Sequence, residues 1–307
     1  MQLRLLAPRY WPIWAGLALL RLVAFMPFAW IVHGGAALGA CMRRLPVSFV
    51  RIARRNIELC FPELDARARE RLLAAHFRSL GIALLEVPLA WWCAPGRFAR
   101  LVRIEGAEHL RAARAANTGV IVLTAHFTSM EMAGRAIASV LPVGFLYRAT
   151  KNEALAYALK RFRSAHGGNP IPMDDIRAFI SALRRGECVW YAPDQSYRKK
   201  GAEMVPMFGI PAATNTLTSR LARMTGAPVL PFFLRRLPGT RGYQAVIHPP
   251  LENFPGDSPA ADAERFNRMI EAQIRLAPDQ YLWIHRRFKG LSDDYPDYYA
   301  RHASRRA

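Results

Sequence analysis

The alternation of two kinds of apolar segment after Gly106 is the feature that most constrains how this chain folds. Short uncharged runs, rich in branched or aromatic residues, alternate with longer segments whose apolar residues recur at helical spacing. The short runs predict strands at 119–125, 143–148, 187–192, 228–234 and 243–248. The longer segments predict helices at 129–139, 153–164, 174–185, 213–225 and 261–276. Such alternation predicts an α/β fold with a mostly parallel central sheet flanked by helices.

The N-terminal segment has a different character. From Leu22 to Met42 the chain carries no formal charge at neutral pH, although Arg21 and Pro27 interrupt the longer apolar region. About 20 apolar residues cross a bilayer, and no small-residue cleavage pattern suggests a signal peptide. We therefore expect residues 1–45 to form an N-terminal membrane anchor and residues 46–307 to form one further domain. The anchor either spans the membrane as a helix or lies in its plane as an amphipathic hairpin.

The net charge of +20, from 43 basic and 23 acidic residues, indicates an anionic partner. Nucleic acid is the poorer candidate because no zinc-finger spacing, helix-turn-helix pattern or basic repeat accompanies the charge. Basic residues instead follow the first apolar segment, at Arg43, Arg44, Arg51, Arg54 and Arg55. This placement favours an anionic lipid surface, with the rest of the chain on the cytoplasmic side.

Four widely scattered cysteines (Cys41, Cys60, Cys93 and Cys188) show neither a C-x-x-C motif nor a histidine at metal-ligand spacing. We expect buried free thiols in a reducing compartment, with no disulfide and no metal site.

A histidine directly follows the first predicted strand. His126 precedes Glu131 by five residues, and no other histidine of the eight has an acidic residue at that offset. Thr128 to Glu131 has the form of a capping box, which predicts that a helix starts there. With a strand-to-helix turn between them, Glu131 is expected to fold back and orient the His126 imidazole as a general base. The structural alternative is a buried histidine beside a helix-capping glutamate.

Further polar residues lie at or after strand ends, where open α/β sheets place their ligand sites. The candidates for substrate binding are Arg148, Asn152, Asp194, Gln195, Arg286 and Arg287. Among them, Arg148, Arg286 and Arg287 are expected to line the mouth of the site. The alternative for each is a local role, such as a surface ion pair for Arg148 or a turn cap for Asp194.

Six motifs in chain order carry a resemblance to a known family. They are Arg54-Arg55-Asn56-Ile57-Glu58-Leu59-Cys60-Phe61-Pro62-Glu63-Leu64, His126-x4-Glu131, Tyr147-Arg148-x3-Asn152, Trp190-Tyr191-Ala192-Pro193-Asp194-Gln195, Phe208-Gly209-Ile210-Pro211-Ala212 and Gln280-Tyr281-Leu282-Trp283-Ile284-His285-Arg286-Arg287-Phe288-Lys289. The chain resembles the late acyltransferases of lipid A biosynthesis, the lauroyl/myristoyl transferase family, within the broader H-x4-D/E acyltransferases. The resemblance covers nearly the whole chain, and it implies a glycerolipid-acyltransferase-like fold.

The resemblance implies transfer of a fatty acyl group from acyl carrier protein to a hydroxyl on a 3-hydroxyacyl chain of a Kdo-bearing lipid A precursor. His126 would remove the hydroxyl proton, and Glu131 would hold the imidazole. Arg148, or backbone N–H groups near Pro211, would stabilise the oxyanion. No cofactor is implied beyond the acyl donor, and the partners are acyl carrier protein, the anionic precursor and inner-membrane lipid. The cell inner membrane, with the catalytic domain facing the cytoplasm, is the implied location.

Three other functions fit the residues. They are acylation of a glycerophospholipid or other membrane lipid, hydrolysis of an acyl thioester, and non-catalytic membrane binding in which His126 and Glu131 are structural.

Overall fold

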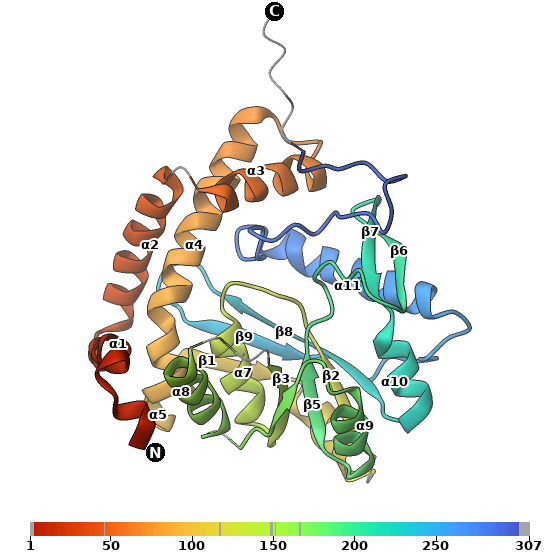
Figure 1. Cartoon of the computed structure of the whole chain (residues 1–307), viewed down its shortest axis with the longest axis horizontal. Coiled ribbons are helices and arrows are strands. Elements are labelled where there is room, and N and C mark those ends of the chain that lie inside the picture. Colours follow the sequence, from red (N-terminus) through yellow and green to blue (C-terminus); the bar gives the residue numbers. More distant parts are fainter. Residues whose placement is uncertain are drawn as a thin grey trace, which may run out of the picture.

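The computed structural model describes residues 3–45, 47–116, 118–147, 150, 152–165 and 167–300. Within these ranges, seven strands form a central sheet in the order β1-β9-β8-β2-β5-β3-β4, and β6 and β7 form a separate hairpin (Figure 1). The strands are β1 (Val102–Glu105), β2 (Val120–Leu123), β3 (Val143–Tyr147), β4 (Pro170–Pro172), β5 (Cys188–Tyr191), β6 (Ala202–Met207), β7 (Ile210–Asn215), β8 (Val229–Arg236) and β9 (Tyr243–Ile247). Only β9 and its neighbour β1 run against the other five strands, because β9 pairs antiparallel with β8 and parallel with β1.

Helices cover both faces of this sheet. They are α1 (Trp11–Val23), α2 (Phe28–Arg44), α3 (Ser48–Cys60), α4 (Ala66–Trp92), α5 (Pro95–Leu101), α6 (Ala107–Ala115), α7 (Met130–Ala138), α8 (Glu153–Ser164), α9 (Ile176–Arg184), α10 (Leu217–Thr225) and α11 (Pro259–Leu276), preceded by two short 3-10 helices, η1 (Leu3–Leu6) and η2 (Pro8–Tyr10). The predicted mixed α/β fold with a mostly parallel sheet is confirmed.

The central strands are buried on both sides. In β2, Val120 and Val122 face a core shared with α4, α5, α6 and α7. Ile121 and Leu123 face the opposite core, which is shared with α3, α9, α10 and α11. Successive side chains of a strand point to opposite faces, so a strand buried twice has to be apolar at every position. This explains the continuous apolar run in the sequence.

The expected elements agree with the structure except in one region. All five predicted strands form. The helix predicted at 213–225 is wrong at its start, because residues 210–215 form β7, which pairs antiparallel with β6. The Asn215 side chain accepts a hydrogen bond from the Leu217 N–H at 3.0 Å, and α10 begins there. Periodicity alone did not separate the end of a hairpin from the first turn of a helix.

The N-terminal apolar region forms two helices rather than one. Pro27 precedes the first residue of α2, and residues 24–27 separate α1 from α2. Arg97 donates hydrogen bonds to the carbonyl groups of Ala24 and Met26, which fixes this turn against α5. Among the described residues, the one helix long and apolar enough to cross a membrane is α4, and 61% of its apolar window is buried. The N-terminal membrane anchor stays a prediction.

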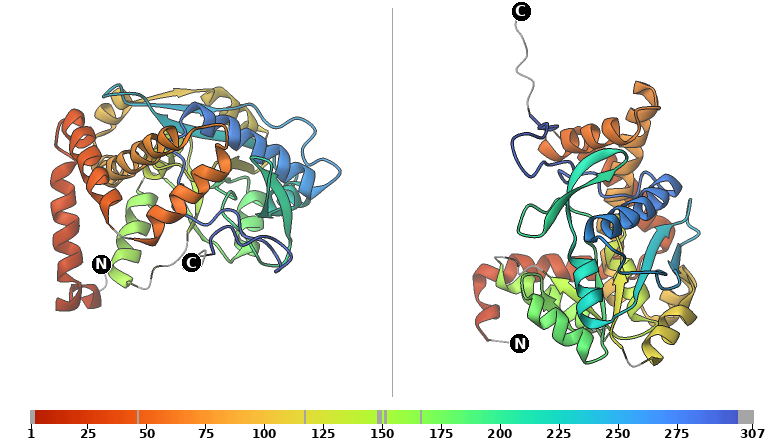
Figure 2. Two further views of the ribbon diagram at one scale, coloured as in Figure 1. Left: turned by 90° about the horizontal axis from the view of Figure 1, so that it is seen from above. Right: turned by 90° about the vertical axis from the view of Figure 1, so that its right-hand side faces the viewer.

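Glycines set how closely α2 approaches α4. A side chain at Gly39 would meet the Phe77 carbonyl of α4, and one at Gly81 would meet the Gly35 carbonyl of α2. By contrast, α1 buries none of its residues and lies at the outer edge of the molecule (Figure 2).

Candidate active site

His126 and Asp194 meet because the strands that precede them are neighbours. β2 and β5 pair in parallel, so their carboxyl ends reach the same edge of the sheet. The loop after β2 carries His126, and the loop after β5 carries Asp194. His126 Nδ1 lies 2.7 Å from Asp194 Oδ1, and the His126 backbone N–H donates to Asp194 Oδ2 at 3.0 Å.

This geometry determines which ring nitrogen of His126 is available for chemistry. A carboxylate only accepts hydrogen bonds, so Nδ1 carries a proton and the neutral imidazole has its lone pair on Nε2. Burial by itself lowers the pKa of His126, but the charge of Asp194 and its hydrogen bond outweigh burial and raise that pKa above its ordinary value of 6.5. The pair has the geometry of a general base and its orienting carboxylate.

Asp194 is enclosed on all sides. Its side chain is 0% exposed, against 25% for His126. The Tyr281 hydroxyl donates to Asp194 Oδ2 at 3.0 Å, as a third donor to the carboxylate. Burial alone would raise the pKa of Asp194, but the His126 charge and hydrogen bonds hold it well below its ordinary value. Asp194 was predicted to bind substrate, yet in the structure it is sealed behind His126 and orients it.

The segment before His285 holds the His126 loop in place. The Leu282 N–H donates to the His126 carbonyl at 2.9 Å, and the Thr128 N–H donates to the Gln280 carbonyl at 2.7 Å. The bridge between Phe127 and Tyr281 is antiparallel, like a short strand pair. The motif from Gln280 therefore supports both members of the pair.

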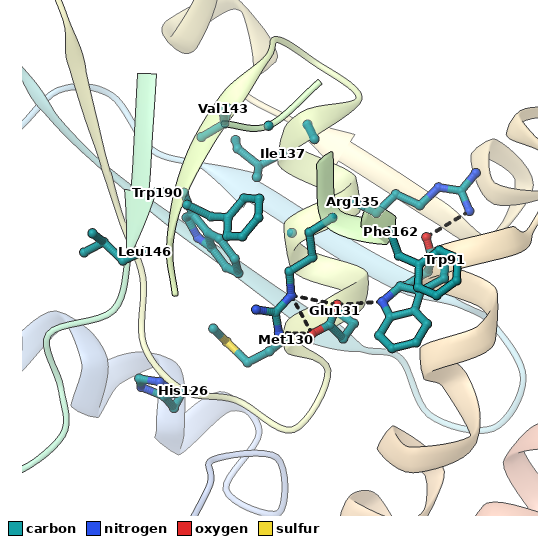
Figure 3. Close-up of a pocket in the computed structure, with 16 residues that line it drawn as sticks. Trp91, His126, Met130, Glu131, Arg135, Ile137, Val143, Leu146, Phe162 and Trp190 are labelled. Atoms are coloured by element: carbon teal, nitrogen blue, oxygen red, sulfur yellow. Dashed lines mark hydrogen bonds and ion pairs between the residues drawn. The ribbon is translucent and has the colours of Figure 1, made fainter. Parts of the chain in front are cut away.

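Glu131 lies elsewhere than expected. Its carboxylate accepts a hydrogen bond from Trp91 Nε1 at 2.8 Å and pairs with the guanidinium group of Arg163, whose Nε lies 3.1 Å away (Figure 3). The prediction that Glu131 orients His126 is corrected, because Asp194 occupies Nδ1. The helix predicted to start at Thr128 to Glu131 does form, since α7 begins at Met130, but without the capping-box contact. Ser129 precedes the helix without a side-chain cap, and the Thr128 hydroxyl hydrogen-bonds with Ser79 of α4 at 3.0 Å.

A pocket opens beside His126. Its volume is about 230 Å³, and its lining is mainly apolar. Figure 3 shows His126 at one end, Val143 and Ile137 at the other, and Trp190 between them. The lining residues come from α4, the His126 loop, α7, β3, α8, the loop before β4, and β5: Ala90, Trp91, His126, Met130, Glu131, Gly134, Arg135, Ile137, Ala138, Val143, Phe145, Leu146, Phe162, Arg163, Gly168 and Trp190. The buried Arg135 donates hydrogen bonds to the Leu89, Ala90 and Cys93 carbonyl groups. Its guanidinium group therefore binds the C-terminal end of α4.

The remaining predicted site residues divide into three cases. Arg148 lies outside the described residues. The Asn152 side chain caps α8 by accepting from the Leu155 N–H at 3.0 Å, which is a structural role. Gln195 follows Asp194 and is exposed.

Neither Arg286 nor Arg287 is among the residues that line the pocket. Arg286 is exposed, with its guanidinium group over the Tyr299 ring at 5.8 Å. Arg287 is 1% exposed and donates to the Ala213 carbonyl at 3.1 Å and to the Thr214 hydroxyl at 2.9 Å. The expectation that both guanidinium groups reach the mouth of the site is wrong for Arg287, which fastens the β6–β7 hairpin from inside. Adjacent residues of an irregular segment point in different directions. The sequence around Arg286 and Arg287 therefore did not show which of the two side chains is buried.

Sequence reasoning did not assign Tyr281, Trp91 or Arg163 to the site. Tyr281 lies inside a motif that the sequence did mark. Trp91 and Arg163 carried no signal, since their contacts to Glu131 join residues 40 and 32 positions apart.

Another histidine lies close to the pair but cannot replace His126. His285 Nδ1 donates to the Leu282 carbonyl at 2.8 Å, and burial lowers the pKa of His285 to about 4 despite the charge of Asp194. His285 is therefore neutral near pH 7. Among the described residues, no group of three or more His, Cys, Asp or Glu side chains could hold a metal ion.

An oriented imidazole at the carboxyl edge of the sheet, next to an apolar pocket, is an arrangement that can remove a proton beside a bound hydrocarbon chain. The chain belongs to the bacterial lipid A biosynthesis acyltransferase family, whose model matches residues 1–290. It is accordingly an acyltransferase of lipid A biosynthesis, as the motifs predicted.

Relatives align along most of the chain. The lipid A biosynthesis palmitoleoyltransferase of Escherichia coli (strain K12) is 39% identical over 285 residues, covering 92% of this chain and 93% of that protein. The lauroyltransferase of the same pathway and organism is 36% identical over 296 residues, covering 96% and 97%. The corresponding myristoyltransferase is 28% identical over 279 residues, covering 90% and 86%. These relatives are named for different acyl chains, so family membership alone leaves the chain length open.

Proposed function

We propose that this enzyme transfers a fatty acyl group from acyl carrier protein to a hydroxyl of a 3-hydroxyacyl chain on a Kdo-bearing lipid A precursor. The observation that carries the proposal is the His126–Asp194 pair at the end of an apolar pocket. A base with its free lone pair beside a hydrocarbon site suits an alcohol that attacks a long-chain thioester.

In this mechanism His126 Nε2 takes the proton of the acceptor hydroxyl while its oxygen attacks the thioester carbonyl. Asp194 stabilises the imidazolium that forms. The tetrahedral intermediate then collapses, the C–S bond breaks, and the departing thiolate takes the proton from His126. The products are the ester and the free thiol of the carrier, and no acyl-enzyme forms. Arg148, which follows β3 directly in the sequence, is the proposed donor to the oxyanion.

The charge of the enzyme suits these partners. The proposed precursor carries phosphate and carboxylate groups, and acyl carrier protein is expected to be acidic. A net charge of +20 attracts both of them and also an anionic bilayer surface.

We further propose that residues 1–45 attach residues 46–307, the catalytic domain, to the cytoplasmic face of the inner membrane. Large apolar side chains on α1, α2 and the turn between them are exposed: Trp11, Leu19, Leu22, Phe25, Trp30 and Leu38. Exposed apolar patches of this kind mark membrane or protein contacts. The two short helices support embedding as a hairpin more than a single crossing.

Acyl carrier protein that bears a radiolabelled acyl group, incubated with purified full-length enzyme and either lipid A precursor or glycerol phosphate, tests the reaction. We expect labelled precursor and no labelled glycerol phosphate. His126→Ala should reduce transfer by about 10²–10⁴-fold, and a single cooperative thermal unfolding transition, even at a lower midpoint, serves as the control for folding.

Other outcomes would redirect the assignment. Label on glycerol phosphate alone would indicate glycerolipid acylation, and free fatty acid as the sole product in the presence of precursor would indicate a hydrolase. His126→Ala with activity within a few-fold of the unmodified enzyme would refute the mechanism.

A further inference from the structure

The pocket beside His126 is elongated, with different residues at its two ends. His126 stands at one end, where a thioester carbonyl has to lie for the reaction to occur. Ile137 and Val143 stand at the far end, so a straight apolar chain bound by its carbonyl at His126 points toward them (Figure 3).

One face of α7 runs along this direction. Met130, Gly134, Ile137 and Ala138 all line the pocket and recur at the spacing of a single helical face. At a rise of 1.5 Å per residue, Met130 and Ala138 are separated by about 12 Å along the helix axis. Each turn of α7 therefore corresponds to a given depth in the pocket.

Gly134 lies in the middle of this face, next to the indole ring of Trp190. A Cβ atom placed there would lie 3.3 Å from Cζ3 and 3.5 Å from Cη2 of the Trp190 indole ring. Trp190 comes from β5, and its indole packs against α7 at Gly134. A hydrogen atom at position 134 thus lets the indole lie against the helix backbone, and a larger side chain would displace the indole into the pocket and shorten the space beyond it.

Trp190 lines the pocket with its indole ring and makes no polar contact there with any residue that the structure describes. Its Nε1 atom is buried and has no hydrogen-bond partner among the described residues. Replacing Trp190 by a smaller apolar residue therefore changes the volume of the pocket without breaking a polar contact.

We propose that Gly134 and Trp190 select the length of the donor acyl chain, by setting whether its terminal carbons pass from the His126 end into the space bounded by Ile137, Ala138 and Val143. This inference rests on the proposed function, since it takes the pocket to hold the donor chain. Filling position 134 favours shorter donors, and reducing Trp190 favours longer ones.

A competition between two donors tests the proposal. The full-length enzyme receives equimolar dodecanoyl and hexadecanoyl thioesters of acyl carrier protein with one acceptor, and mass spectrometry gives the ratio of the two products. Gly134→Leu should shift this ratio at least about tenfold toward the dodecanoyl product, because a hydrophobic pocket discriminates about 10–200-fold per misfitted methylene. Gly134→Ala should shift it less in the same direction, and Trp190→Phe should shift it toward the hexadecanoyl product.

The product ratio does not depend on how much of a variant is folded, because both donors compete for the same active molecules. Gly34→Leu is the matched control, since Gly34 is also helical but lies outside the pocket, with only Leu85 Cδ1 within 4 Å at 3.7 Å. It should leave the ratio unchanged.

Displacement of a fluorescent fatty acid from the same proteins by dodecanoate and hexadecanoate provides a measurement that does not require transfer. Ratios within twofold of the unmodified enzyme for both Gly134→Ala and Trp190→Phe, in either measurement, would overturn the proposal while leaving the proposed function intact. Absence of any transfer by the unmodified enzyme, with length-selective fatty acid displacement retained, would instead count against the proposed function alone.

Discussion

At the scale of single residues, the decisive contact joins side chains 68 positions apart. Asp194 fixes the tautomer of His126 and leaves Nε2 free, whereas the acidic residue of the His126-x4-Glu131 motif pairs with Arg163 and Trp91. The two carboxylates therefore have separable effects. Asp194 sets the tautomer and the pKa of His126, and Glu131 holds the pocket-lining side chains of Trp91 and Arg163 in place.

The pH dependence of Asp194→Asn tests the first of these effects. Catalysis needs neutral His126, so the rate of the unmodified enzyme should rise with pH through a pKa above 6.5. Removing the carboxylate leaves burial as the main influence, which lowers the pKa of His126. We expect the acidic limb of the kcat/KM profile to move to lower pH and the maximal rate to fall by about 10²–10⁴-fold. An unmoved limb would show that Asp194 is not the orienting group.

The same pair should make stability depend on pH. The pKa of Asp194 is lowered by folding, so its contribution is present above the unfolded value of about 3.9 and is lost as the pH falls toward the folded pKa. The pKa of His126 is raised by folding, so its contribution is present below about 6.5 and is lost as the pH rises through the folded pKa. The difference in unfolding free energy between unmodified enzyme and Asp194→Asn should be largest between about pH 4 and 6.5. Denaturant titrations across pH measure it, and a difference that increases steadily above pH 7 would contradict it.

Glu131→Gln should behave differently. Its carboxylate is not bonded to His126, so the acidic limb of the pH profile should remain where it is. Loss of the charged pair with Arg163 should lower stability by about 1.5–3 kcal/mol and raise the KM for the acyl donor. Paired measurements of kcat/KM against pH on Glu131→Gln and Asp194→Asn make the comparison, and a limb shifted equally in both would restore Glu131 as a partner of the base.

At the scale of elements, five of the seven strands of the central sheet follow from the sequence, and β1, β4 and the helix contacts do not. The runs around β2 and β5 are apolar at every position because both faces of the sheet are covered. The β6–β7 hairpin was missed because its residues do not form such a run. No local pattern shows that α2 and α4 meet at Gly39 and Gly81, since helix packing depends on which faces come together.

Gly39→Ala tests that close contact. A Cβ atom there would collide with the Phe77 carbonyl of α4, which is backbone and cannot move aside as a flexible side chain can. We expect a loss of about 1–3 kcal/mol from overpacking. Gly34→Ala in the same helix is the control, and it should gain about 0.5–1 kcal/mol because alanine is the better helix former and its Cβ would make only an ordinary contact, at 3.7 Å from Leu85 Cδ1. Unfolding midpoints of both variants in one detergent measure the difference, and equal midpoints would contradict the packing account.

At the scale of the whole molecule, one edge is apolar. The exposed side chains of α1, α2 and their turn give the protein a surface that water solvates poorly, on a chain whose net charge is +20. Apolar insertion and attraction to anionic lipid act together in membrane binding.

Leu22→Glu combined with Phe25→Glu should weaken membrane attachment, because both side chains are more than 60% exposed and each glutamate adds a charge that resists burial in lipid. Leu276→Glu is the matched control, at 61% exposure on α11, and should leave attachment unchanged. Flotation with anionic vesicles measures the bound fraction. Carbonate extraction of the unmodified protein from membranes then distinguishes embedding from surface attachment, since quantitative release would leave only the latter.

The sequence by itself determined the features that local chemistry dictates. Apolar runs specified the buried strands of an α/β fold, Pro27 divided the N-terminal helices, and motifs in a fixed order identified the family. Only the tertiary structure decided which carboxylate serves His126, that Arg287 points inward, and that Trp190 lies against Gly134. The physical reason is that strand order and helix packing bring residues together across long separations. Local spacing constrains one turn of chain, whereas these contacts depend on which strands become neighbours in the sheet.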